Sequence, residues 1–203
     1  ITVSRGVGGI GLDPALCASP TIVIMAKPLV APAAALYETG VDVILATTRR
    51  NLPSALPPQI KSLNFLNNIL AKREALAAGA FDSILLNWEG HLTECTISNL
   101  FFVTDGQLHT PSLECGLLDG ITRSIVLQLA KEQNITVSEG RFTPAQLYQS
   151  DESFVTNTSM EIMPVTSVDR RPIGDGKPGP LTRTLRSLFS GARERFLEPA
   201  SLQ

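Results

Sequence analysis

The sequence has few cysteines and few aromatic residues, and it contains no long apolar run. Its 203 residues include only three cysteines, Cys17, Cys95 and Cys115. An odd number without paired metal spacing disfavours disulfides and zinc, and it favours free thiols in a reducing cytoplasm. No apolar stretch approaches the length that crosses a bilayer, and no basic-then-apolar leader opens the chain. We therefore expect a cytoplasmic protein without a membrane span.

The sequence also lacks a large excess of either charge: the formal net charge is -2, and the basic residues are scattered. A nucleic-acid partner bound through a charged face is therefore not expected. A hydrophobic content of 43% in 203 residues fits one large globular domain or two small ones. The first residue is Ile1, inside an expected strand, so we expect an upstream portion that this sequence does not include.

The spacing of apolar residues predicts a mixed α+β fold with a largely antiparallel sheet. Strands are expected at 1–4, 21–26, 41–47, 83–88, 91–94, 99–103, 107–110, 135–138, 153–156 and 162–168. The runs 21–26 and 41–47 are continuous and apolar, so both are expected to be buried. Turns at Glu89-Gly90 and Asp105-Gly106 join two pairs of strands into hairpins. Hairpins imply antiparallel pairing, which disfavours a doubly wound parallel fold.

The clearest expected helix follows residue 61. Ser62 can cap it, Gly79 can end it, and its apolar residues at helical spacing are Leu63, Leu66, Ile69, Leu70 and Leu76. Other helices are expected at 120–132, 144–149 and 181–196, with a short helix or turn at 33–38 and a turn and glycine-rich loop at 169–179.

The segment Gly6–Gly11 has the literal spacing of a dinucleotide-binding fingerprint. That fingerprint must open a helix, whereas Asp13-Pro14 and the residues after it read as a loop. A flexible connection or a turn is the better interpretation.

Lys61 is the first candidate for chemistry. A proline-rich loop precedes it, and Ile60 and Leu63 flank it. Desolvation by apolar neighbours would favour its neutral amine, which can attack a carbonyl and form a Schiff base. The alternative is an ordinary lysine whose charged head stays in water.

Glu94 ends a strand and is followed by small polar residues at 95–99 that suit a turn lining a pocket. A carboxylate there could hold a heterocyclic nitrogen in its protonated form. The alternative is a solvated glutamate at a strand end.

Residues 118–123 open a helix whose free amides at Ile121 and Thr122 suit a phosphate. Asp119 is equally plausible as a plain N-cap. The polar segment 157–161 could be a second anion contact or only a satisfied turn. An amine, a carboxylate and a phosphate cradle are together what a pyridoxal phosphate site needs.

These residues also carry a family resemblance, which extends in order from Ile1 to about Phe189. The matching segments are 61–64, 66–74, 93–94, 98–101, 110–113, 120–123 and 161–165. They resemble the class IV aminotransferases, the fold-type IV pyridoxal phosphate enzymes that include branched-chain aminotransferases, D-amino acid aminotransferases and aminodeoxychorismate lyases.

The resemblance implies a role for each candidate residue. Lys61 would be the catalytic Schiff-base lysine, and Glu94 would pair with the pyridine nitrogen of pyridoxal 5'-phosphate. Leu118 would pack on the ring, while the Ile121 and Thr122 amides and Thr158 would hold the phosphate. The Ser159-Met160 backbone would lie near the substrate carboxylate.

The resemblance also implies a domain plan and a partner. Residues 1–20 would be the end of an N-terminal lobe and its connecting loop, and residues 21–203 would be the cofactor-binding domain. Family members pair through this domain, so a homodimer is expected. The family's N-terminal lobe supplies an arginine to the phosphate and a tyrosine to the substrate pocket, and neither can be identified in this sequence. Cofactor binding would be weak without that guanidinium.

Three interpretations of the substrate and activity stay open. Ile10 and Leu12 stand where D-specific members carry basic residues, which favours an L-amino acid. We expect amino-group transfer between a branched-chain-like L-amino acid and a 2-oxo acid. The runner-up is an aminodeoxychorismate lyase that releases pyruvate and forms 4-aminobenzoate, because Ser4-Arg5-Gly6 and Asn157 also occur in that enzyme type. A truncated, inactive scaffold is the third interpretation.

Overall fold

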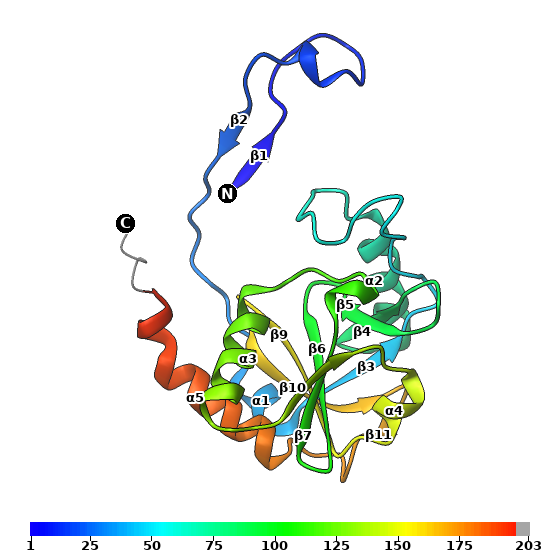
Figure 1. The fold of residues 1–203 in the computed structure, drawn as a ribbon, viewed down its shortest axis with the longest axis vertical. Coiled ribbons are helices and arrows are strands. Elements are labelled where there is room, and N and C mark those ends of the chain that lie inside the picture. The colour runs from blue at the N-terminus through cyan, green and yellow to red at the C-terminus, as the bar shows by residue number, and fades with distance from the viewer. Residues whose placement is uncertain (198–203) are drawn as a thin grey trace. The chain divides into compact units, whose positions relative to one another are not determined.

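The computed structural model describes residues 1–197, which form two compact units. The first unit is Ile1–Ala31, and the second begins at Pro32 (Figure 1). Among the described residues, no helix is both long and apolar enough to cross a membrane.

The first unit is a two-stranded antiparallel ribbon that carries the glycine-rich loop. Its strands are β1 (Thr2–Ser4) and β2 (Thr21–Val23), and a short 3-10 turn, η1, spans Pro14–Leu16. Arg5 donates hydrogen bonds to the carbonyls of residues 11, 12 and 13, and these bonds hold the loop together. The loop opens no α-helix, which agrees with the interpretation as a turn. The buried strand expected at 21–26 is wrong, because β2 is shorter and its side chains are exposed.

The second unit is built on a nine-stranded mixed sheet. Its strands are β3 (Val41–Leu45), β4 (Asp82–Leu86), β5 (Leu92–Cys95), β6 (Asn99–Thr104), β7 (Gln107–Pro111), β8 (Val137–Gly140), β9 (Glu152–Asn157), β10 (Glu161–Val168) and β11 (Arg171–Pro172). The β4–β5 and β6–β7 hairpins are antiparallel, as the turns predict. Strand β3 runs parallel to both β4 and β10, and β7 runs parallel to β8. The predicted α+β fold with a largely antiparallel sheet is therefore confirmed.

Six of these strands close on themselves. The order β10-β3-β4-β5-β6 is completed by β9, which pairs with both β6 and β10. One apolar cluster draws residues from all six strands, and it includes Val43, Ile84, Leu100, Val155 and Met163. Because side chains alternate between the two faces of a strand, this cluster fills the inside of the closed ring.

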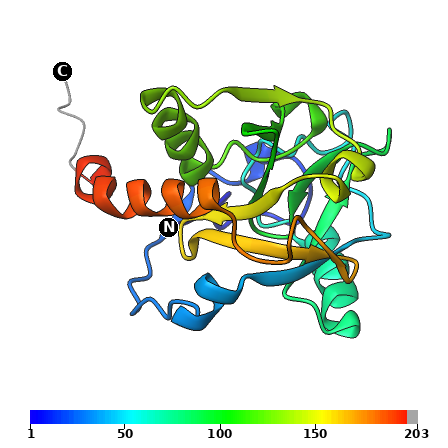
Figure 2. The same ribbon diagram turned by 90° about the horizontal axis from the view of Figure 1, so that it is seen from below.

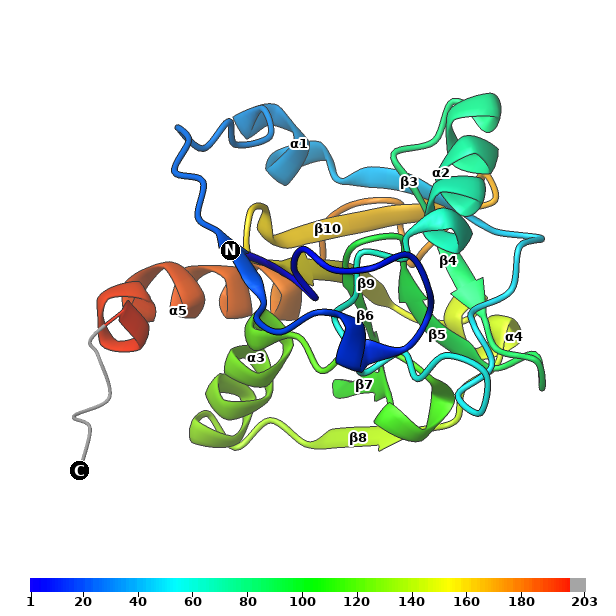
Figure 3. The same ribbon diagram turned by 90° about the horizontal axis from the view of Figure 1, so that it is seen from above.

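Helices pack around the ring. They are α1 (Ala34–Thr39), α2 (Leu66–Ala78), α3 (Ile121–Glu132), α4 (Pro144–Tyr148) and α5 (Pro180–Leu197), and a 3-10 turn, η2, spans Leu113–Cys115. Figure 2 shows α5, in orange and red, running beside the yellow strands β9 and β10. Figure 3 shows α2 beside β4, and α3 with α5 on the other side of the sheet. A second apolar cluster, which includes Phe101, Phe154, Val126 and Leu185, fills the layer under α3 and α5.

Helix α2 departs from its expected form at its start and on its buried face. It begins at Leu66 rather than after Ser62, and no side chain caps it, although Gly79 ends it in the left-handed conformation as predicted. Its buried residues are Asn68, Ala71 and Ala75, while the expected apolar stripe of larger residues is exposed. The small side chains face β4 because they let the helix approach the sheet closely.

Two smaller differences concern the end of the chain. The expected strand at 135–138 lies two residues later, at β8, and the loop expected at 169–179 contains the short strand β11. Strand β11 pairs with β10 through Arg171 and Pro172, and it leaves the site unaffected.

Candidate functional site

A cavity of about 390 Å³ opens in the second unit, between the end of β5, the start of α3 and the loop before α2. This size falls within the usual range for small-molecule sites. The cavity brings together six of the eight residues that the sequence singles out, namely Lys61, Glu94, Leu118, Ile121, Thr122 and Thr158.

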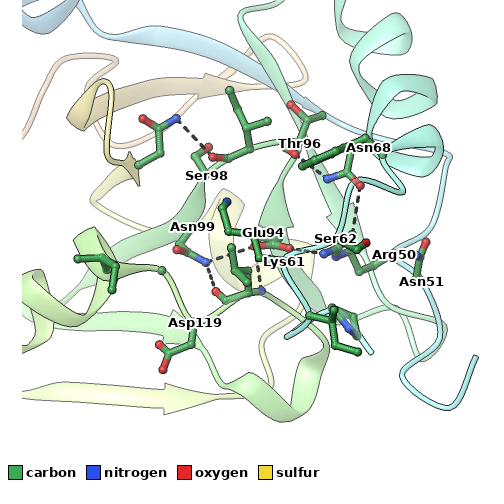
Figure 4. Close-up of a pocket in the computed structure, with 18 of the residues that line it drawn as sticks. Arg50, Asn51, Lys61, Ser62, Asn68, Glu94, Thr96, Ser98, Asn99 and Asp119 are labelled. Carbon is green, nitrogen blue, oxygen red and sulfur yellow. Dashed lines mark hydrogen bonds and ion pairs between the residues drawn. The ribbon is translucent and has the colours of Figure 1, made fainter. Parts of the chain in front are cut away.

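Glu94 is buried at the base of this site, with only 5% of its surface exposed. Its Oε1 lies 2.7 Å from a guanidinium nitrogen of Arg50, while its Oε2 accepts hydrogen bonds from the Leu118 amide at 3.1 Å and from Asn99 Nδ2 at 3.3 Å. Figure 4 shows Glu94 between Arg50 and Asn99, with a dashed contact to each. The alternative of a solvated strand-end glutamate is therefore wrong.

Two opposed influences set the charge on Glu94. Burial is the largest and raises the pKa of Glu94 to about 7, because a carboxylate loses hydration in the interior. Arg50, the Leu118 amide and Lys61 all act to lower the same pKa, because each favours the ionised form. A cation that entered the cavity beside Glu94 would lower it further.

Lys61 reaches the cavity on a loop that is fixed at two points. The Ile60 amide donates to the Pro57 carbonyl at 3.0 Å, and the Gln59 side chain donates to the Leu113 carbonyl at 3.1 Å. Lys61 itself is exposed, and so are Ile60 and Leu63. The apolar enclosure expected from these two neighbours is therefore wrong. Lys61 is five residues before α2 rather than at its mouth.

The start of α3 offers free backbone donors to the cavity. Its N-cap is Gly120, and no side chain caps it. Asp119 is therefore not the N-cap, and its carboxylate instead accepts from Arg123 and Ser124. Because the first amides of a helix have no partner within it, Ile121 and Thr122 can donate to an anion.

The segment after β9 forms a polar turn. Asn157 Oδ1 accepts hydrogen bonds from the amides of Ser159 and Met160, each at 2.9 Å. Among the described residues, Asn157 and Thr158 line the cavity, whereas Ser159 and Met160 do not. The substrate role of Ser159 and Met160 stays a prediction.

Sequence reasoning missed Arg50 and Asn68, and it placed Asn99 only within the expected pocket-lining turn at 95–99, of which residues 96–99 line the cavity. Arg50 donates to Asn68 Oδ1 at 3.2 Å, and Asn68 in turn donates to the Thr96 carbonyl at 2.6 Å. Asn99 Nδ2 donates to the Leu118 carbonyl at 2.8 Å as well as to Glu94. The adjacent arginines Arg49-Arg50 just before the proline-rich loop are the one local signal that could have pointed here.

Comparison with known proteins decides the family. The family described as amino-transferase class IV matches residues 1–168. The chain belongs to the class IV aminotransferases. The predicted family membership is thereby confirmed.

Solved structures of class IV aminotransferases share this fold at clear sequence similarity. The branched-chain amino acid aminotransferase of Escherichia coli superimposes with a TM-score of 0.90 at 36% identity, over 93% of this chain and 63% of that one. The branched-chain aminotransferase of Thermobaculum terrenum, solved in its PLP-form, gives a TM-score of 0.76 at 36% identity, over 80% of this chain and 53% of that one.

A relative with a different named substrate is also similar. The D-alanine aminotransferase of Listeria innocua is 42% identical over 130 residues, which are 64% of this chain and 45% of that protein. This chain therefore spans about half to two thirds of the length of these three relatives.

Proposed function

We propose that this chain belongs to an enzyme that uses pyridoxal 5'-phosphate to transfer an amino group between a branched-chain L-amino acid and a 2-oxo acid. The observation that carries the proposal is the convergence of Lys61, Glu94 and the uncapped start of α3 on one cavity. These groups are far apart in the sequence, and the fold brings them to a single volume of about 390 Å³.

The residues present fit this cofactor. Its pyridine nitrogen needs an acid, its aldehyde needs an amine, and its phosphate needs backbone donors. The donor set of the cavity supplies one of each, and no side-chain cap occupies the first amides of α3. The Glu94 carboxylate is anchored on both oxygens before any ligand arrives.

Each residue then has a separate task in holding the cofactor. Glu94 holds the ring nitrogen through its carboxylate, and Leu118, whose amide and carbonyl are both fixed, packs on the ring. The amides of Ile121 and Thr122 and the hydroxyl of Thr158 hold the phosphate. The division into residues 1–20 as the end of an N-terminal lobe and residues 21–203 as the cofactor-binding domain stays a prediction, and the first compact unit extends further, to Ala31.

Lys61 performs the proton transfer. When bound, pyridoxal phosphate supplies an electron sink for the carbanion that forms at the substrate α-carbon. With the cofactor bound, the Lys61 amine would take the proton from the substrate α-carbon and would then, as an ammonium group, donate a proton to the cofactor carbon. Glu94 stabilises positive charge at the ring nitrogen throughout, because an opposite charge at close range favours the protonated form.

The branched-chain substrate is supported by two observations. Two of the three relatives described above are named as branched-chain aminotransferases. Ile10 and Leu12 are apolar where a D-specific site would need basic residues. The similarity to a D-alanine aminotransferase makes D-alanine the competitor that an assay must include.

One assay tests this proposal. The chain, with pyridoxal 5'-phosphate added, is incubated with 2-oxoglutarate and either L-leucine or D-alanine, and glutamate formation is measured. We expect turnover with L-leucine, loss of that turnover in Lys61→Ala, and no loss in Lys177→Ala, an exposed lysine elsewhere.

Three other outcomes would point elsewhere. Turnover with D-alanine alone would contradict the proposed branched-chain substrate. Pyruvate and 4-aminobenzoate formed from aminodeoxychorismate, without glutamate from L-leucine, would establish the lyase instead. No turnover with any substrate would support the inactive scaffold.

A further inference from the structure

We propose that Arg50 is a positioning residue for Glu94: it holds this buried carboxylate in one orientation and favours its ionised form, so that Glu94 can face a cationic ring nitrogen. This inference rests on the proposed function only in naming the ring nitrogen as the partner. The link between Arg50 and Glu94 stands on the structure of the chain alone.

The two side chains form a close, buried ion pair. The distance between Arg50 Nη2 and Glu94 Oε1 is 2.7 Å, and the two side chains are 9% and 7% exposed. At this depth a pair gains from its short distance, but removing one partner leaves the other charge uncompensated. The pair therefore acts as a unit, and the state of Glu94 depends on Arg50.

Arg50 is itself fixed at its backbone and at its guanidinium group. Its backbone amide donates to the Leu86 carbonyl of β4 at 2.9 Å, and its Nη1 donates to Asn68 Oδ1 of α2. Two residues earlier in the chain, Thr48 donates to Glu74, which is also on α2. A guanidinium held at its backbone and at its head has little freedom to turn toward another ligand.

The contacts leave Glu94 with one acceptor position for a ligand. A carboxylate has about four lone-pair positions. Arg50 occupies one on Oε1, while the Leu118 amide and Asn99 occupy two on Oε2. Among the described residues' contacts, the remaining position is on Oε1, so the free lone pair lies beside the Arg50 guanidinium.

Other charged groups at the cavity do not replace Arg50. Lys61 is exposed and acts on Glu94 through space, and Asp119, whose side chain is 53% exposed, is negative. Burial raises the pKa of Glu94, and Arg50 is the strongest single influence that lowers it. Without Arg50, the pKa of Glu94 would be higher still and a larger fraction of the carboxyl group would be neutral, and a neutral acid cannot balance a cationic ring nitrogen.

A direct test follows the carboxyl group of Glu94 in the cofactor-free chain by carbon-13 NMR as the pH is varied. We expect Arg50→Met to raise the pKa of Glu94 and Arg50→Lys to restore part of the difference. Arg49→Met, which changes the adjacent exposed arginine, should leave the titration unchanged. An identical titration in Arg50→Met and in the unmodified chain would overturn the proposal.

A second measurement separates this role from direct phosphate binding. Affinities for pyridoxal and for pyridoxal 5'-phosphate are measured by absorbance in Arg50→Met, in Glu94→Gln and in the double variant. We expect Arg50→Met to lower the affinity for both ligands by the same factor, roughly tenfold. In the chain that already carries Glu94→Gln, the same substitution should cause no further loss of affinity. Weakening of the phosphorylated ligand alone, or the same loss in both backgrounds, would overturn the proposal.

The double variant removes both charges, so neither is left buried without a partner. It therefore still reports on binding if Arg50→Met alone does not fold. If the unmodified chain binds neither ligand, the proposed function fails, while the NMR titration still decides the role of Arg50.

Discussion

Gly120 lies so close to Asn99 that a Cβ atom at position 120 would come within 2.1 Å of Asn99 Oδ1. The backbone of Gly120 has a φ of -76°, which any residue can adopt, so the constraint is the contact and not the conformation. Asn99 bonds both to Glu94 and to the Leu118 carbonyl. This one close approach therefore connects the start of α3 with the buried carboxylate.

The Gly120→Ala substitution tests that connection. The added methyl group should displace Asn99 and loosen Leu118 and Glu94, which lowers stability by about 1–3 kcal/mol and weakens binding of pyridoxal 5'-phosphate. Thermal unfolding and an absorbance titration measure the two effects. Gly191→Ala is the matched control, because nothing lies within 4 Å of a Cβ at that exposed position of α5. Equal cofactor affinity in both variants would contradict the connection.

The charge of Glu94 gives a second prediction. Glu94→Gln keeps the size of the side chain but cannot be ionised, so it should reduce both cofactor affinity and turnover, the latter by roughly 100-fold, a typical loss for one electrostatic contact. Glu194→Gln, at an exposed position of α5, is the control. Titration and steady-state kinetics measure the effects, and turnover that survives unchanged in Glu94→Gln would exclude the ring-nitrogen role.

The third prediction concerns Glu74 and the way the stability of the fold depends on pH. Burial acts to raise its pKa, but hydrogen bonds from the hydroxyls and amides of Thr48 and Thr47 outweigh burial and lower the pKa of Glu74 to about 2. Because its pKa is lower in the folded than in the unfolded chain, Glu74 stabilises the fold above pH 4.5. That stabilisation is lost as the pH falls from 4.5 toward 2.

The variant Glu74→Gln should lack this dependence. Urea unfolding at pH 7 and at pH 3 should show a gap between the unmodified chain and Glu74→Gln that narrows at the lower pH. The gap at pH 7 should be roughly 2 kcal/mol after solvent screening is allowed for. A gap that stays constant with pH would show that Thr47 and Thr48 do not lower the pKa of Glu74.

The buried face of α2 gives a fourth prediction. Ala71 is fully buried against β4, whereas Ile69 is 54% exposed. Ala71→Leu should destabilise the chain by about 1–3 kcal/mol through overpacking, and Ile69→Ser should change stability by about 0.5 kcal/mol or less. Thermal unfolding of the dilute chain measures both. The reverse order of effects would mean that the sequence-based view of this helix was right.

Local signals predicted the local features of this fold. The Glu89-Gly90 and Asp105-Gly106 turns identified both hairpins, and Gly79 identified the end of α2, because each depends on residues adjacent in sequence. The start of α2 was misjudged because Ser62 is a good cap by residue type, although the chain there still follows the proline-rich loop. Closure of the sheet depends on β9 pairing with β6 and β10, which no short window reveals.

The site shows the same contrast between features that depend on neighbouring residues and features that depend on distant contacts. Lys61, Glu94 and the start of α3 were identified from their residue types and from the family resemblance, and the structure places them around one cavity. Arg50 was missed because an arginine in a loop has no distinctive pattern, and Asn99 was expected only to line a pocket, without its contacts. Their roles come from contacts with residues 44 and 19 positions away, Glu94 and Leu118, and those contacts exist only in the folded chain.

The measurement that tests the central claim most directly is the location of the lysine to which the cofactor attaches. The chain is incubated with one equivalent of pyridoxal 5'-phosphate, reduced with borohydride, digested, and mapped by mass spectrometry. We predict that the label is on Lys61 in the unmodified chain and that Lys61→Ala takes up no comparable label. A label distributed over other exposed lysines, with Lys61 free, would contradict the whole assignment.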